Sequence, residues 1–305
     1  MSDMVIIGSR GSKLALVQAE LVADKARQAR PELKVQIRKI VTEGDRNMAV
    51  NIEEAGVGIF VKALEDALIN HEIDLAVHSL KDLPVVLPDK LNLVAVTERS
   101  DPRDALVSSA PINKLKSGAI IGTSSVRRSA QIRILRPDLQ TVGIRGNVDT
   151  RLRKAASGEV DGIIVAAAAM LRLGREDEIT EYLSLDCFVP AAGQGALAIE
   201  ARKDDKFVED LAASINHVST WKAVTAERAF LEYLGGGCSA PISCIAVVEA
   251  GQLKITGMVS DRNGKNMLKD NMEGDSADPE AVGRLLAEKM LREGAKAIVD
   301  EIRCR

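Results

Sequence analysis

Short apolar segments alternate with segments of helical period along the first part of the chain, and the alternation restarts after a polar connector. Val5–Gly8 has the composition of a buried strand, and a helix is predicted over Lys13–Arg30. After the connector Ser100–Asp104, a strand at Ala119–Gly122 and a helix at Val126–Leu135 repeat the same order. Strands that alternate with helices build mostly parallel sheets with helices on both faces. The pattern therefore predicts two successive α/β domains.

The length of the chain and the pattern of its last third predict a further domain. A single hydrophobic core stops growing at about 250 to 300 residues, and this chain has 305. Helices are predicted over Lys206–Asn216, Thr220–Leu234 and Pro279–Glu293, with a hairpin around Ala250–Gly251. We expect a small α+β domain there. Gly193–Ala198 matches a dinucleotide-binding fingerprint, but we reject that reading because a strand is predicted where the fingerprint requires a helix.

Positive side chains recur at the turns that follow the predicted strands. Open α/β sheets bind ligands at these turns, because free backbone N–H groups and the positive ends of helix dipoles meet there. A cation in a first helical turn opposes the dipole by roughly 0.3 to 1 kcal/mol, so repeated cations indicate a compensating anion. Since the sequence has no Walker loop, a carboxylate is favoured over a nucleotide phosphate. The turns are Arg10 with Ser12, Lys81 after Ser79, Arg127 and Arg128 after Ser124, and Arg145 and Arg151 beside Asn147.

A glycine-rich loop, Gly235–Pro241, follows the helix predicted to end at Leu234. Its three consecutive glycines allow positive φ and close backbone approach, so the loop can present one small side chain, Cys238, at the tip of a tight turn. From the loop alone, the more common interpretation is that Cys238 has no functional role, because short motifs often occur by chance. Other segments of the chain have to support a role for Cys238.

Composition argues against several classes of protein. A net charge of −3, a pI near 5.8 and 2% aromatic residues argue against a nucleic-acid binder, which needs a basic excess and stacking rings. The four cysteines lack CxxC spacing and the three histidines are scattered, so neither a disulfide scaffold nor a metal site is expected. Neither a signal peptide nor a membrane-spanning segment is found, so we expect a cytoplasmic protein without membrane partners.

Several longer segments give the chain a resemblance to the porphobilinogen deaminase family over essentially its whole length. Their number and their order along the chain make this resemblance specific. The matching segments are Ser9–Leu16, Phe60–Glu65, His78–Pro84, Gly122–Arg128, Arg145–Leu152, Gly193–Ala196 and Gly236–Cys238.

The resemblance implies an enzyme that joins four porphobilinogen molecules head to tail, releases ammonia at each step and yields the linear tetrapyrrole hydroxymethylbilane. It implies a dipyrromethane cofactor linked by a thioether to Cys238. The family fold has two domains like those of type II periplasmic binding proteins and a third that carries the cysteine. It also implies a monomer. The corresponding boundaries are residues 1–96 with 196–216 for the first domain, 101–190 for the second and 219–305 for the third.

The resemblance also assigns roles to individual residues. Asp82 would be the catalytic carboxylate. Because each pyrrole carries an acetate and a propionate, the arginines would face the cleft and pair with carboxylates. Lys81, Ser124, Arg127, Arg128 and Arg145 would bind the cofactor, and Arg10, Ser12, Gln18, Phe60, Arg151 and Arg172 would bind the incoming pyrrole or line its site.

The sequence departs from the family pattern in a polar stretch before the second predicted helix. Val57 stands between Gly56 and Gly58, where the family usually has a lysine, and Glu43 replaces a usual arginine. We therefore assign no electrostatic role to Val57. The replaced arginine belongs to the family's Thr-Arg-Gly-Asp segment, in which Asp45 is the one charged residue that this chain keeps in register.

Two other classes of protein share the two-block alternation. A two-lobed binding protein for a small carboxylate ligand is disfavoured because no export signal is found, and the effector domain of a regulator is disfavoured because no DNA-binding helix pair is found. A third alternative is a transferase that acts on phosphate groups. Among these, a covalently bound dipyrrole is predicted for the deaminase alone.

Overall fold

Residues 4–41, 58–235 and 241–303 are described by the structure, which is a computed structural model of the chain. Its contacts divide the chain into two compact units. Unit 1 comprises Met1–Ser100 and Ala196–Trp221, and unit 2 comprises Asp101–Gly195 and Lys222–Arg305. The chain therefore leaves unit 1 after residue 100 and returns to it after residue 195. Within the described residues, no helix is long and apolar enough to cross a membrane.

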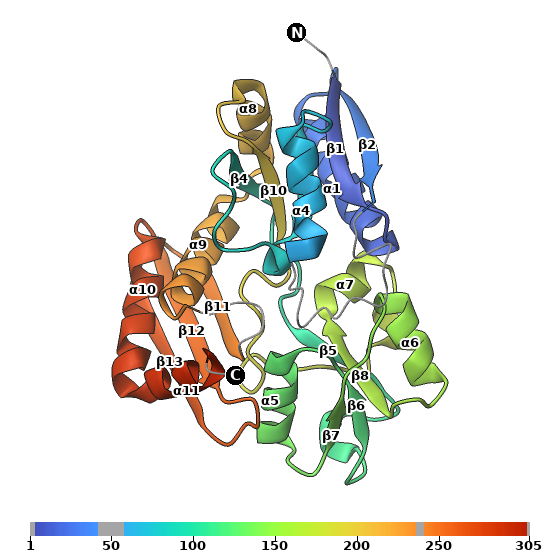
Figure 1. The fold of residues 1–305 in the computed structure, drawn as a ribbon, viewed down its shortest axis with the longest axis vertical. Coiled ribbons are helices and arrows are strands. Elements are labelled where there is room, and N and C mark those ends of the chain that lie inside the picture. The colour runs from blue at the N-terminus through green and yellow to red at the C-terminus, as the bar shows by residue number, and fades with distance from the viewer. Residues whose placement is uncertain (1–3, 42–57, 236–240, 304–305) are drawn as a thin grey trace. The chain divides into compact units, whose positions relative to one another are not determined.

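A mixed five-stranded sheet with the order β2-β1-β3-β10-β4 is the frame of unit 1. β1 pairs in parallel with β2 and β3, whereas β10 runs antiparallel to both β3 and β4. β10 thus lies beside β4 although about a hundred residues separate them in sequence (Figure 1). The elements are β1 (Met4–Arg10), α1 (Lys13–Ala29), β2 (Lys34–Ile40), α4 (Gly58–Ile69), β3 (Leu75–Ser79), a 3-10 turn (Leu80–Asp82), β4 (Leu91–Val96), β10 (Leu197–Arg202) and α8 (Lys206–Ile215).

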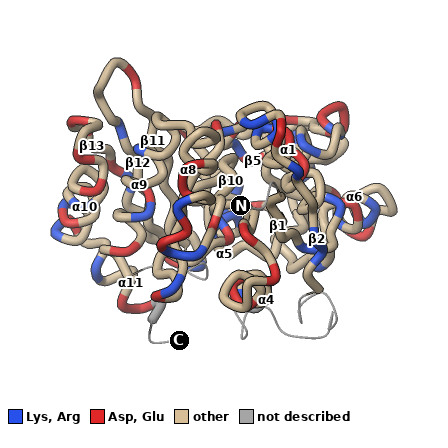
Figure 2. The backbone as a smooth tube through the Cα atoms, turned by 90° about the horizontal axis from the view of Figure 1, so that it is seen from above, with Lys and Arg blue, Asp and Glu red and all other residues tan. Residues whose placement is uncertain are grey.

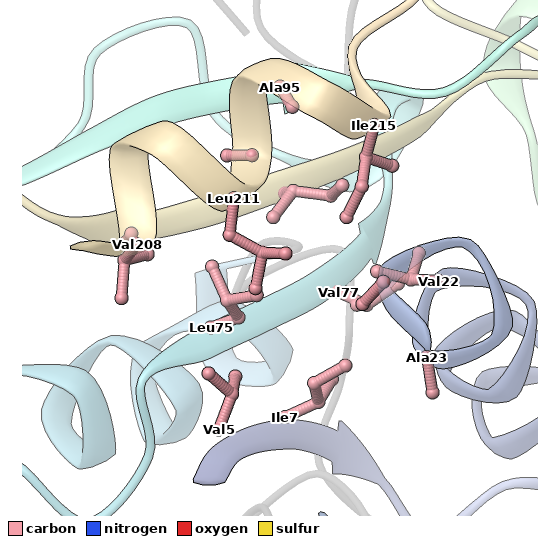
Figure 3. Close-up of a cluster of buried hydrophobic side chains, with 14 of the residues drawn as sticks. Val5, Ile7, Val22, Ala23, Leu75, Val77, Ala95, Val208, Leu211 and Ile215 are labelled. Carbon is pink, nitrogen blue, oxygen red and sulfur yellow. The ribbon is translucent and has the colours of Figure 1, made fainter. Parts of the chain in front are cut away.

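The core of unit 1 follows from the alternation of side chains along its strands. Val5 and Ile7 of β1 and Leu75 and Val77 of β3 are buried on one face of the sheet, together with Leu211 of α8 (Figure 3). α1 packs against the same face. Each large side chain buried in this way stabilises the fold by about 1.5 to 3 kcal/mol. This packing fixes the direction of β1 and β3, and with it the place where both strands end.

Unit 2 begins with a second mixed five-stranded sheet, of order β7-β6-β8-β5-β9. β6 pairs in parallel with β7 and β8, whereas β5 runs antiparallel to β8 and β9. Asp104, which the sequence placed in a connector, is the first residue of β5. The elements are β5 (Asp104–Ser108), β6 (Ile120–Gly122), α5 (Val126–Leu135), β7 (Gln140–Val142), α6 (Val148–Ala156), β8 (Gly162–Ala166), α7 (Ala167–Arg172) and β9 (Glu181–Tyr182), with short 3-10 turns at Ile112–Lys114 and Glu176–Glu178.

The C-terminal part of unit 2 is an antiparallel sheet, β11-β12-β13, packed against helices. α9 and α10 approach each other closely, because a Cβ at Gly283 would lie 2.0 Å from the carbonyl oxygen of Ala226. Phe230 of α9 is fully buried in the shared core. The elements are α9 (Val218–Tyr233), which belongs to unit 2 from Lys222 on, β11 (Ile242–Glu249), β12 (Gln252–Ser260), β13 (Met267–Asp275), α10 (Pro279–Met290), a π-helical segment (Leu291–Ala295) and α11 (Lys296–Arg303).

The predicted fold class is confirmed: two mixed α/β sheets with helices, and a small C-terminal α+β part with a three-stranded sheet. The strand Leu197–Arg202 also confirms that the glycines before it do not form a dinucleotide-binding turn. Three strands were not predicted, Asp104–Ser108, Glu181–Tyr182 and Met267–Asp275, and the last is the longest of them. Exposed and half-buried residues alternate along Met267–Asp275, so this strand carries no apolar run to mark it in the sequence.

Candidate functional site

The turn that carries Lys81 and Asp82 is held from both sides. The backbone N–H of Leu80 donates to the carbonyl of Ala196 at 3.0 Å, and the N–H of Leu83 donates to the carbonyl of Leu80 at 3.0 Å. Leu80 and Leu83 are both buried, whereas Lys81 is half-buried and Asp82 is exposed. The turn therefore presents a carboxylate to solvent from a backbone that buried side chains fix in place.

A buried pair lies at the end of β3, directly before this turn. His78 Nε2 lies 2.9 Å from Glu200 Oε2, and both side chains are buried. The pKa of the nearby Glu65 carboxyl is raised, first by burial and second by the charge of Glu200. Gln18, predicted to line the site, is also buried, and its Nε2 donates to Ser79 Oγ at 2.9 Å. These contacts tie β3 to β10 and α1 where the turn begins.

Arg10 and Ser12 lie at the same edge of the unit 1 sheet as this turn. β1 and β3 are parallel, so their carboxyl ends, at Arg10 and Ser79, point the same way. Ser12 is the N-cap of α1, and its Oγ accepts from the N–H of Ala15 at 3.3 Å. Unit 1 thus gathers two cations and the Asp82 carboxylate at one sheet edge, beside a helix N-terminus.

Arg127 and Arg128 occupy the first turn of α5, and both side chains are buried. Each is only 6% exposed. Arg128 Nη2 lies 2.6 Å from Asp104 Oδ1, and Arg127 Nη2 lies 2.8 Å from Asp104 Oδ2. Burial lowers the pKa of the Arg127 guanidinium, and the Asp104 charge opposes that shift. A buried carboxylate therefore holds both guanidiniums inside unit 2, and the role predicted for them in binding the cofactor stays a prediction.

The turns after β6 and β7 lie next to each other, since these strands are parallel neighbours. Ser124 Oγ donates to the carbonyl of Ile144 at 2.8 Å, which links the two turns. Asn147 caps α6, and Arg151 Nε donates to the carbonyl of Gly146 at 2.9 Å. Arg145 is exposed. The predicted residues of this region are thus brought together at one edge of the second sheet.

Arg172, at the end of α7, has a largely buried side chain. Its Nη2 donates to the carbonyl of Gly195 at 2.6 Å. Burial lowers the pKa of its guanidinium to about 10, from an ordinary value of 12.5. In the part of the chain that the structure describes, no carboxylate forms an ion pair with it. Burial removes water from the charged guanidinium, and an anionic ligand would offset this loss of hydration. Arg172 is therefore a candidate for contact with an anionic ligand.

The C-terminal helices have a different charge pattern. Positive and negative segments alternate along α10 and α11 (Figure 2). Arg284 pairs with Glu280 at 2.7 Å, and Lys289 pairs with Asp270 at 2.6 Å. Surface pairs of this kind are worth about 0 to 1 kcal/mol and need no ligand. These pairs therefore give no indication of an anionic ligand at the C-terminal helices.

Some predicted site residues lie outside the described residues. Cys238 is one of them. Glu43, Asp45 and Val57, where the sequence was compared with the family pattern, also lie outside the described residues. Phe60 lies in the first turn of α4, but its side chain is outside the description.

Two residues at the site were missed by sequence reasoning, Asp104 and Gln194. Gln194 Nε2 donates to the carbonyl of Pro102 at 2.7 Å and to Asp104 Oδ1 at 3.1 Å. The sequence offered one usable signal: two adjacent arginines at a helix start need a nearby carboxylate if they are buried. It did not say which of the 44 acidic residues would supply it.

The family models and the similar sequences agree on one family. Residues 5–210 match the model "Porphobilinogen deaminase, dipyromethane cofactor binding domain", and residues 221–292 match "Porphobilinogen deaminase, C-terminal domain". The chain is 46% identical to the porphobilinogen deaminase of Carboxydothermus hydrogenoformans, over 99% of this chain and 98% of that protein. It is 44% identical to the porphobilinogen deaminase of Bacillus subtilis, over 99% and 98%. Among solved structures it is similar to the methionine binding protein MetQ, with a TM-score of 0.46 and 12% identity, over 72% of this chain and 93% of that one.

Proposed function

Because the chain belongs to the porphobilinogen deaminase family, we propose which of its residues carry the family's reaction. The chain is a transferase that condenses four porphobilinogen molecules into hydroxymethylbilane, with loss of ammonia, on a dipyrromethane cofactor. The family match over nearly the whole chain carries this conclusion. The alternative of a two-lobed binding protein without activity is not favoured.

The described residues fit a cofactor and a substrate that bear several carboxylates. Arg172 is largely buried without an acidic partner among the described residues, and Arg127 and Arg128 share a single carboxylate, Asp104. Both arrangements leave positive charge that an acetate or propionate would neutralise. When bound, the dipyrromethane supplies the pyrrole carbon to which the first porphobilinogen is joined.

We assign the roles as follows. Asp82, on its fixed turn, stabilises the positive charge that develops as ammonia leaves, and Cys238 anchors the cofactor. The other assignments rest on family resemblance, and some of these residues also lie in the turns that follow strands. Lys81, Ser124, Arg127, Arg128 and Arg145 bind the cofactor, and Arg10, Ser12, Gln18, Phe60, Arg151 and Arg172 bind the incoming pyrrole or support its site.

The first test is the intact mass of the purified protein. We expect a mass above that of the sequence by one dipyrromethane, and a ladder of heavier species after brief exposure to porphobilinogen. A protein with the mass of its bare sequence, which gains nothing from porphobilinogen, would contradict the proposal. Apoprotein reconstituted with porphobilinogen serves as the control for incomplete loading during expression.

A second prediction separates the exposed from the buried arginines. Arg145→Leu should leave the melting temperature close to that of the wild type and reduce cofactor assembly, because Arg145 is exposed. Arg127→Leu should also lower the melting temperature, because it leaves Asp104 with one guanidinium fewer in a buried site. Removing one member of a buried ion pair costs about 3 to 5 kcal/mol, and we expect the lower end because Arg128 remains. Equal melting temperatures for the two variants would show that the Arg127 pair adds nothing to stability.

We further propose a monomer located in the cytoplasm, on family resemblance. The proposed domains are residues 1–96 with 196–216, residues 101–190, and residues 219–305 with Cys238. Light scattering of the purified protein tests the oligomeric state, and limited proteolysis tests the boundaries.

A further inference from the structure

Asp104 is the centre of a buried polar cluster in unit 2. It is fully buried, and its Oδ1 accepts from Arg128 Nε at 3.0 Å, from Arg128 Nη2 at 2.6 Å and from Gln194 Nε2 at 3.1 Å. Its Oδ2 lies 2.8 Å from Arg127 Nη2. One carboxylate therefore holds three side chains that come from two segments of the chain.

Backbone carbonyls hold the two guanidinium groups from the other side. Arg127 Nη1 donates to the carbonyl of Val189 at 2.8 Å, and Arg128 Nη1 donates to the carbonyl of Ile164 at 2.9 Å. A guanidinium has five N–H donors, so these contacts leave others available to a ligand. Arg127 also lies over the Phe188 ring, 6.0 Å from its centroid, but the Asp104 carboxylate is the charged group that contacts both guanidiniums.

The charges in the cluster do not balance. In the contacts of the described residues given above, two guanidiniums face one carboxylate, which leaves one net positive charge among these three side chains, and each arginine is only 6% exposed. An unbalanced buried charge is costly, and a single bound carboxylate would offset it. Without Asp104 the same site would carry two positive charges.

The cluster also reaches Arg172. Gln194, which contacts Asp104, lies next to Gly195, whose carbonyl accepts from Arg172 Nη2 at 2.6 Å. Gly195 has a φ of 92°, a left-handed conformation that suits glycine. Asp104 is therefore connected to a third arginine, Arg172, through the adjacent residues Gln194 and Gly195.

We propose that Asp104 is a positioning residue for the reaction: it orients Arg127 and Arg128, sets the net charge of their cluster to one, and so prepares it for one ligand carboxylate. This inference rests on the cofactor role proposed above for the two arginines. Asp104 itself does not touch the ligand.

The test uses Asp104→Asn, with Asp101→Asn as the matched control. Asp101 lies three residues earlier and loses the same charge, but it pairs with Arg103, whose side chain is 40% exposed. In the otherwise wild-type protein, Asp104→Asn should reduce the fraction that carries dipyrromethane, read by intact mass, by roughly tenfold, the effect of one lost charge-assisted contact. Asp101→Asn should load like the wild type, and Asp104→Glu should load better than Asp104→Asn.

A second readout needs neither cofactor nor catalysis. In a Cys238→Ala background, inorganic phosphate at constant ionic strength should raise the melting temperature of the Asp104→Asn variant more than that of the parent, because the cluster then carries two positive charges. Asp101→Asn should respond like the parent. Gln194→Met, which removes only one contact of Asp104, replaces Asp104→Asn if that variant does not fold, and is expected to reduce loading as well.

The outcomes separate this inference from the proposed function. Normal loading of Asp104→Asn, together with an unchanged response to phosphate, would overturn the positioning role. If the wild-type protein itself carried no dipyrrole, the proposed function would fail, while the phosphate readout would still decide whether Asp104 sets the charge of the cluster.

Discussion

Cys238→Ala should yield a folded protein that carries no dipyrromethane and does not convert porphobilinogen. A thioether needs this sulfur, and the other described cysteines are poorly placed to replace it. Cys244 is buried in β11, with its Sγ 3.6 Å from the carbonyl of Glu227. Cys187 is exposed, but it follows β9 and lies far along the sequence from the glycine-rich loop. The loss of activity should therefore be complete within the detection limit.

Intact mass and far-ultraviolet circular dichroism together check this prediction. The variant should have the mass of its bare sequence and the helix content of the wild type. Cys187→Ala is the control, and it should carry the cofactor and turn over at the wild-type rate. A covalent dipyrrole found on Cys238→Ala would mean that another residue anchors the cofactor.

The parts of this fold that could be predicted from sequence are those with local causes. The N-caps Ser12 and Asn147 accept hydrogen bonds from residues three positions later. The helix over Val126–Leu135 has the bounds that its pattern predicted. The cations in the turns after the strands could also be predicted from the sequence. The structure brings these turns together, because β1 and β3, and β6 and β7, are parallel neighbours whose carboxyl ends lie at the same edge of the sheet.

The parts that could not be predicted depend on contacts between distant residues. Glu200 and His78 are 122 positions apart, and Arg128 and Asp104 are 24 apart across a strand that resembled a connector. Two adjacent arginines are buried only where a distant carboxylate pairs with them, and hydrophobic periodicity does not show which carboxylate that is. The return of Leu197–Arg202 to the sheet of unit 1 also came from family resemblance, because a strand pattern does not say which sheet the strand joins.

The second large effect is expected at Asp82, the proposed chemical centre. Loss of ammonia from the aminomethyl group of porphobilinogen breaks a C–N bond, and the positive charge left behind is shared with the ring nitrogen. A fixed carboxylate near that N–H stabilises the charge as it develops. Asp82 meets the structural requirement, because Leu80 and Leu83 hold its turn while the carboxylate stays exposed. Preorganised groups of this kind contribute about 3 to 4 kcal/mol, or on the order of a hundred- to thousandfold in turnover.

Asp82→Asn keeps the shape and the hydrogen-bonding capacity of the side chain but removes its charge. Its kcat should fall by roughly a hundredfold or more, while the binding of porphobilinogen changes much less. Asp82→Glu keeps the charge but moves it by one methylene, so it should retain more activity than the Asn variant. Asp89→Asn is the matched control: Asp89 is an exposed aspartate in the same connection between β3 and β4, and its replacement should leave turnover unchanged. Single-turnover rates of variants shown by intact mass to carry the cofactor are the decisive measurement. If cofactor-loaded Asp82→Asn turns over within tenfold of the wild type, Asp82 is a turn residue and another carboxylate must stabilise the developing charge.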